Sequence, residues 1–343
     1  MKTVQDTYCT LEFLNEVVKL QKESLPHKVA YRIMKNLSNI YLDITASEFL
    51  ELVKSNPYMQ ELLQRGNKTI KAKLNWKDEI SFESNTDTVY FIHPNYIQNY
   101  KEIRKNTGSL IVSSDKNDIT WLERLNNNRG YVCIVPTYCR DGASSDFPYQ
   151  ESWEEAIKTL PIKPVNSLII SDNYLFKEIE LRKEKGLFSI LRAIVPNDLK
   201  IPFHLAIFSY IGDKTSFSKN EADKLISEIK NVFGEEKIKV TIIIHGSNDS
   251  KKTTHDREIL SNYHVITSGI GFSVIEKDKI KDVAKGHIEP VFHSLATTPE
   301  NHMATKHFHF QTLQWLKKIY NKDNIYIAGD REHRMLGLKN EKK

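Results

Sequence analysis

The alternation of apolar runs with amphipathic segments in the second half of the chain constrains its fold most strongly. Three runs rich in Ile, Val, Leu and Phe have the composition of buried strands: residues 165–176, 203–211 and 240–244. Apolar side chains at helical spacing occupy residues 177–194 and the segment that follows Ser218. Strands separated by helices of this length predict a sheet that is covered on both faces and is at least partly parallel.

The first 160 residues predict a separate unit. Helical spacing marks residues 11–21 and 29–37, and Thr45-x-x-Glu48 has the form of a capping box at a helix start. Strands are expected at residues 70–76, 89–92, 110–112 and 131–135. A chain of 343 residues is long enough for two such domains. We therefore expect an α/β protein with an N-terminal α+β domain over residues 1–160 and, over residues 161–343, a mixed sheet flanked by helices.

Composition bears on the cellular setting. No apolar run approaches the roughly 18 residues that a membrane helix needs, and the opening residues lack an apolar signal core. The three cysteines, Cys9, Cys133 and Cys139, form no Cys-x2-Cys pair, as is usual in a reducing compartment. We expect a cytoplasmic protein without a membrane span. The formal net charge of +5 permits nucleic acid or an anionic surface as a partner and requires neither.

The last segment is rich in histidine. The spacing of these histidines fits no common set of metal ligands, and no pair of carboxylates accompanies them. The histidines concerned are His287, His293, His302, His307 and His309. The sequence therefore predicts neither a metal nor another cofactor.

The stretch over residues 251–272 carries the clearest chemical signal. It opens with two lysines, Lys251 and Lys252, and continues with His255 and Arg257, which would share one face of a strand because they are two positions apart. It closes in a turn of small residues that contains Ser268, Gly269 and Gly271. Cations, an imidazole and a small-residue turn suit a phosphate. The alternative is an exposed charge cluster without a ligand.

The pattern His255-x-Arg257-x4-Asn262-x6-Gly269 resembles the motif of the phospholipase-D-like superfamily, which reads H-x-K-x4-D before a Gly-Ser turn. Arg257 stands where that family has Lys, and Asn262 stands where it has Asp. The closer similarity is to a His-Asp-Arg branch that includes the phospholipase-D-like C-terminal domain of MIT-domain proteins, a binding module. The resemblance covers roughly residues 165–276. It extends to Asp172-Asn173-Tyr174, which is similar to the Asp-Pro-Tyr that often ends the first strand in that family.

The resemblance implies a role for each matching residue. His255 would be the nucleophile that forms a phosphohistidine, Arg257 the phosphate clamp and Asn262 an orienting group, without a metal. The remaining phosphate contacts would come from Lys251, Lys252, Asp172, Ser268, Gly269 and Gly271. A single copy of the motif implies a homodimer, because the family's active sites combine two motifs.

Two functions from different classes follow. The first is a protein that engages a phosphodiester, as a metal-independent nuclease or a nucleic-acid-binding effector, with a link to bacterial defence by family analogy. The alternative is a non-catalytic module that binds a phosphorylated ligand, a lipid headgroup or a protein partner. The exchanges of Lys for Arg and of Asp for Asn favour the alternative. A weaker third interpretation is a structural subunit in which the motif is vestigial.

Overall fold

The structure, a computed structural model, divides the chain into two compact units. Unit 1 comprises Met1–Asn128 and Ser294–Phe310, and unit 2 comprises Arg129–His293 and Gln311–Lys343. The expected boundary at residue 160 lies within unit 2 and stays a prediction about domains. The residues that the structure describes are 5–63, 69–80, 88–127, 133–134, 149–150, 153–158, 165–172, 179, 183–210, 219–245, 257–268, 275–276, 279–280, 291–294, 302–321 and 325–339.

Unit 1 contains a five-stranded sheet in the order β3-β2-β1-β4-β5. Every pairing in it is parallel, so this unit is α/β and not the α+β arrangement expected from its sequence. Its elements are β1 (Gln5–Cys9), α1 (Leu11–Leu20), α2 (Leu25–Leu37), β2 (Ser38–Leu42), α3 (Ala46–Ser55), α4 (Pro57–Leu63), β3 (Ile70–Ala72), the 3-10 helix η1 (Trp76–Glu79), β4 (Val89–Ile92), α5 (Tyr100–Thr107), β5 (Leu110–Ser113) and α6 (Lys116–Asn127).

The helix starts in unit 1 follow local sequence signals. Thr10 caps α1, since its side chain accepts a hydrogen bond from the N–H of Phe13. Phe13 is buried and stacks on Phe91 of β4, with ring centroids 4.9 Å apart, which fixes α1 against the sheet. The predicted capping box is confirmed: Thr45 and Glu48 make both of its hydrogen bonds at the start of α3.

The predicted strand over residues 70–76 is wrong beyond Ala72. β3 ends at that residue, and Asn75 adopts the left-handed conformation with φ at 58°, which turns the chain into η1. Trp76 is thereby buried against the sheet, with its ring 5.4 Å from that of Tyr8. The alternation of apolar and polar residues in this stretch therefore comes from a strand followed by a turn.

Unit 2 contains a seven-stranded sheet in the order β15-β12-β11-β8-β9-β10-β16. The central strands β8, β9 and β10 are parallel, whereas β11, β12 and β16 join by antiparallel pairing. The elements are β6 (Cys133–Ile134), β7 (Tyr149–Gln150), α7 (Trp153–Lys158), β8 (Ser167–Ser171), the π-helix η3 (Glu184–Phe188), α9 (Ser189–Ile194), β9 (Phe203–Tyr210), α10 (Lys219–Phe233), β10 (Ile238–His245), β11 (Arg257–Ser261), β12 (His264–Ser268), β13 (Ile275–Glu276), β14 (Lys279–Ile280), β15 (Val291–Ser294), α11 (His302–Tyr320) and β16 (Ile325–Gly329). Two of these elements are shared, because Ser294 of β15 and the residues of α11 up to Phe310 are grouped with unit 1.

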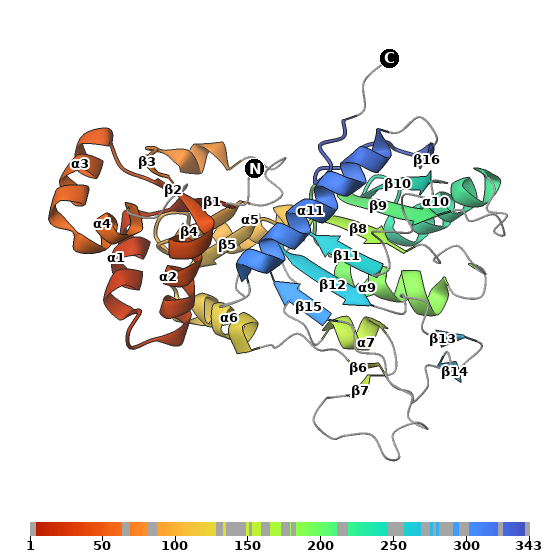
Figure 1. Cartoon of the computed structure of the whole chain (residues 1–343), viewed down its shortest axis with the longest axis horizontal. Coiled ribbons are helices and arrows are strands. Elements are labelled where there is room, and N and C mark those ends of the chain that lie inside the picture. The colour runs from red at the N-terminus through yellow and green to blue at the C-terminus, as the bar shows by residue number, and fades with distance from the viewer. Residues whose placement is uncertain are drawn as a thin grey trace. The chain divides into compact units, whose positions relative to one another are not determined.

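The mixed sheet predicted for the second half is confirmed, and the α/β class holds for the chain. One sheet face packs on α7, α9 and α10 around a core that includes Leu168, Ile207 and Ile242. The part of α11 (labelled in Figure 1) that follows Phe310 belongs to unit 2, and Trp315 in this part meets the ring of His245 at a centroid distance of 6.2 Å.

The helical spacing of Leu225, Ile229 and Val232 predicts a shared buried face, from which α10 departs at one position. Leu225 and Ile229 are buried as expected, but Val232 is 52% exposed. Ala222 and Ile226 complete the buried face in its place. Val232 lies in the last turn of the helix, which ends at Phe233 and leaves this side chain to solvent.

The described helices include none that is both long and apolar enough to cross a membrane.

Candidate functional site

One edge of the unit 2 sheet gathers the ends of its central strands. β8, β9 and β10 run parallel and end there, β11 begins there at Arg257, and β12 ends there at Ser268. Arg257 and Ser268 are register partners, and Glu258 pairs with Ser171, so Asp172 lies opposite Arg257. Ligands of open α/β sheets bind beyond strand ends of this kind. Strand register thus brings together Asp172, Arg257 and the backbone of Ser268.

Arg257 and Asp172 form an ion pair at this edge. The Nε of Arg257 is 3.9 Å from the Oδ1 of Asp172, and the two side chains are 14% and 1% exposed. Asp172 is held by β9, because its N–H donates to the carbonyl of Phe208 at 3.1 Å and its carbonyl accepts from the hydroxyl of Ser209 at 2.8 Å. A buried carboxylate repels a phosphate. Asp172 is therefore better described as the group that orients Arg257 than as a phosphate contact.

Asn262 does not belong to this site. It follows β11 at the opposite end from Arg257, and five residues of extended chain span roughly 16 Å. Its side chain is buried, and its Oδ1 accepts the backbone N–H groups of Asn166 and Ser167, both at 2.9 Å. Its Nδ2 donates to the Oδ1 of Asn166 at 2.8 Å. The expectation that Asn262 orients a catalytic group is corrected: this amide ties the start of β8 to the turn between β11 and β12.

Five of the predicted site residues lie outside the described part of the chain. They are Lys251, Lys252, His255, Gly269 and Gly271. Their roles stay predictions, which rest on their proximity in sequence to Arg257 and Ser268.

His245 is a polar residue at the same sheet edge that the sequence reasoning missed. It ends β10, is 3% exposed and packs edge-on against Trp315. Ile244 is in register with Ser209, which neighbours Asp172, so His245 faces the other side of the sheet from Arg257. A polar residue that ends an apolar run, the signal that identified Asp172, could have found it. Its opposite orientation separates it from the Arg257 site.

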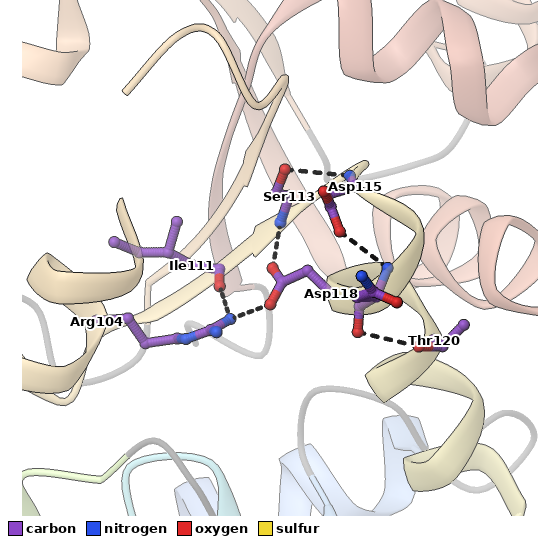
Figure 2. Close-up of polar contacts among 7 residues, drawn as sticks. Arg104, Ile111, Ser113, Asp115, Asp118 and Thr120 are labelled. Carbon is purple, nitrogen blue, oxygen red and sulfur yellow. Dashed lines mark hydrogen bonds and ion pairs between the residues drawn. The ribbon is translucent and has the colours of Figure 1, made fainter. Parts of the chain in front are cut away.

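Unit 1 has its own polar cluster at the end of β5 (Figure 2). Asp118 accepts from the Nη1 of Arg104 and from the N–H of Ser113, each at 2.7 Å, and the same Nη1 donates to the carbonyl of Ile111 at 2.8 Å. Asp115 accepts from the N–H of Asn117 at 2.9 Å at the start of α6. These contacts join α5, β5 and α6. Their role is structural, because they satisfy backbone groups within the unit.

The strand order of unit 1 reverses between β1 and β4, where ligands of doubly wound sheets usually bind. Here the strand ends bond to each other. The N–H of Thr10 donates to the carbonyl of Phe91 at 3.0 Å, and the hydroxyl of Thr10 accepts from the N–H of His93 at 3.0 Å. These hydrogen bonds join the chain just after β1 to the end of β4, at the point where the strand order reverses.

Within the described residues, no three His, Cys, Asp or Glu side chains are grouped so that they could hold a metal.

The sequence matches no known protein-family model, and no curated protein matches it.

Proposed function

We propose that unit 2 binds a phosphodiester chain, that of a nucleic acid, at the sheet edge that carries Arg257. The observation that supports this proposal is the strand register, which sets Arg257 beside Asp172 and the end of β12. The guanidinium of Arg257 has a planar fork of N–H donors that suits phosphate oxygens. Lys251, Lys252 and His255 precede it directly in sequence and would extend the cationic surface.

Binding is favoured over hydrolysis by the position of Asn262. The predicted catalytic set needs this residue beside His255 and Arg257, whereas its amide is buried at the far end of β11 and bonds to Asn166 and Ser167. Hydrolysis through His255 would therefore need a different orienting group. The proposed function is accordingly a nucleic-acid-binding module.

The test compares binding of labelled single-stranded and duplex oligonucleotides by fluorescence anisotropy over a range of salt concentrations. The informative variant is Arg257→Gln with Asp172→Asn, which removes the guanidinium and its partner while the net charge stays the same. We expect affinity to fall about tenfold or more, as for one lost charge-assisted contact. The slope of log K against log salt should become shallower by about one phosphate contact.

Arg192→Gln with Glu184→Gln is the matched control, because it removes a surface ion pair of unit 2, 2.8 Å long, and also keeps the net charge. Equal affinities for the control and the Arg257 variant would refute the proposal. Release of nucleotides in EDTA by the wild type, abolished in His255→Ala, would show hydrolysis and overturn the choice of binding over catalysis.

A further inference from the structure

The segment after β16 is fastened to the amino-terminal ends of the parallel strands in unit 2. We name residues 330–338 the C-terminal clasp. The N–H of Asp330 donates to the carbonyl of Val240 at 2.9 Å, and its Oδ2 accepts the N–H of Val240 at 2.7 Å. Lys230 of α10 pairs with the same carboxylate at 3.1 Å. Met335 and Leu336 are buried, so the clasp contributes apolar surface to the fold.

Two buried histidines hold the rest of the clasp. The Nδ1 of His204, in β9, accepts the N–H of Arg334 at 3.2 Å, which requires that this nitrogen carries no proton. His333, in the clasp, bonds through Nε2 to the carbonyl of Leu168 at 3.0 Å, so this nitrogen is the donor. The rings of the two histidines are 6.1 Å apart, and both side chains are buried. The closed clasp therefore requires that His204 is a neutral imidazole, whereas the buried ring of His333 can make its hydrogen bond in either protonation state.

The charges that face these histidines oppose protonation. Arg334, His333 and Lys239 lie near His204, and the one described carboxylate is Glu332, whose Oε1 is 4.0 Å from its Nε2. Burial, followed by the charge of Arg334 and the proximity of His333 and Lys239, lowers the pKa of His204 to about 2. Burial also lowers the pKa of His333 to about 4, with a smaller contribution from Arg334, although the hydrogen bond to the carbonyl of Leu168 and the nearby backbone of His204 act in the opposite direction. A proton on either ring would place an additional charge beside Arg334.

We propose that the C-terminal clasp is an acid-sensitive latch, which opens when His204 and His333 are protonated and then exposes Met335 and Leu336.

The direction of the pH dependence of clasp opening follows from proton linkage. A histidine whose pKa is depressed in the closed form contributes stability above its ordinary pKa of 6.5 and loses it as the pH falls below that value, because the open form binds the proton first. Between pH 7 and pH 5 the ratio of open to closed clasp should rise about 20-fold per histidine, or about 400-fold for both. Opening thus begins well above the pKa values of the closed form.

Amide hydrogen exchange of the full chain, followed by mass spectrometry at pH 7, 6 and 5 and corrected for the intrinsic rate, tests the latch. Protection of residues 330–338 should fall by about 100-fold or more, whereas β9 should stay protected. The variant His204→Asn with His333→Gln replaces both rings by neutral amides that place an acceptor and a donor at the corresponding positions. In this variant the protection should change less than about threefold between pH 7 and pH 5.

Unchanged protection of the wild-type clasp, or an equal loss in the double variant, would overturn the proposal. If the double variant does not fold, the histidine ring signals in NMR spectra of the wild type decide. As the pH falls, the ring signals of both histidines should shift over the same pH range as the amide signals of the clasp. Separate titration of the two rings near pH 6.5, with the clasp amides unaltered, would also overturn it.

Discussion

At the scale of single residues, two of the described buried polar side chains bind backbone groups at strand ends. Asp118 accepts the N–H of Ser113 and the guanidinium of Arg104, and Asn262 accepts two N–H groups at the start of β8. Such residues resemble ligand-binding residues only in their residue type. Their contacts show that they hold strand ends in place.

Replacing Asp118 by alanine should lower the free energy of unfolding by about 2 kcal/mol, because the N–H of Ser113 and the guanidinium of Arg104 lose a charged acceptor. Asp115→Ala is the control, since it removes one hydrogen bond at the start of α6 and should cost about 1 kcal/mol. Urea unfolding monitored by circular dichroism measures both. Equal costs would contradict the assignment of Asp118 as the central member of the cluster.

Asn262→Ala should cost about 3 kcal/mol, because two buried N–H groups lose their acceptor. The comparison variant is Asn39→Ala, whose side chain accepts from the N–H and the hydroxyl of Thr69 and donates to Asp6 in exposed or partly buried settings, and should cost about 1 kcal/mol. The folded fraction of Asn262→Ala should retain its affinity for oligonucleotides. A selective loss of binding without destabilisation would restore Asn262 to the ligand site.

At the scale of elements, β16 is the edge strand that determines where the clasp begins. It pairs antiparallel with β10 and ends at Gly329, whose φ of 88° turns the chain toward Val240. A Cβ at this position would lie 2.1 Å from the carbonyl oxygen of Val240, so the turn needs glycine for both conformation and space. Gly329 thus both ends β16 and directs the chain into the clasp.

Gly329→Ala should therefore destabilise unit 2 by about 3 kcal/mol or more. Gly337→Ala is a matched control: its φ is 69°, but no atom lies within 4 Å of the added Cβ, so only the conformational cost of about 1 kcal/mol applies. Chemical denaturation of both variants gives the difference. A Gly329→Ala protein as stable as the Gly337→Ala protein would contradict the described approach of the two strands.

At the scale of the whole molecule, each unit has a buried cluster of its own. Trp76, Tyr90 and Ile111 pack together in unit 1, whereas the cluster around Leu168, Ile207 and Ile242 lies in unit 2. Separate cores allow one unit to lose stability while the other keeps it.

This separation makes a prediction for Gly329→Ala. Hydrogen exchange measured in low urea should show faster exchange in β8, β9 and β10 and unchanged exchange in β1 and β4, because the substitution lies in unit 2. Asp118→Ala should produce the reverse pattern. Uniform loss of protection along the chain in either variant would show that the two units unfold as one.

The sequence alone determined the elements and the fold class. Periodicity located α1, β4, β5, β9 and β10 to within a few residues, and the Thr45 capping box marked the start of α3, because these signals depend on neighbours within a few positions. It also identified Arg257 and Asp172 as polar residues near strand ends.

Only the tertiary structure decided which of these residues meet. The antiparallel register of β11 against β8 sets Arg257 beside Asp172 and carries Asn262 to the opposite edge. In the same way, His333 reaches His204 across more than a hundred positions. A local sequence pattern predicts which face of its own strand a side chain occupies. Strand order and register, in contrast, are set by the burial of apolar surface along the whole sheet, and they decide what that side chain contacts.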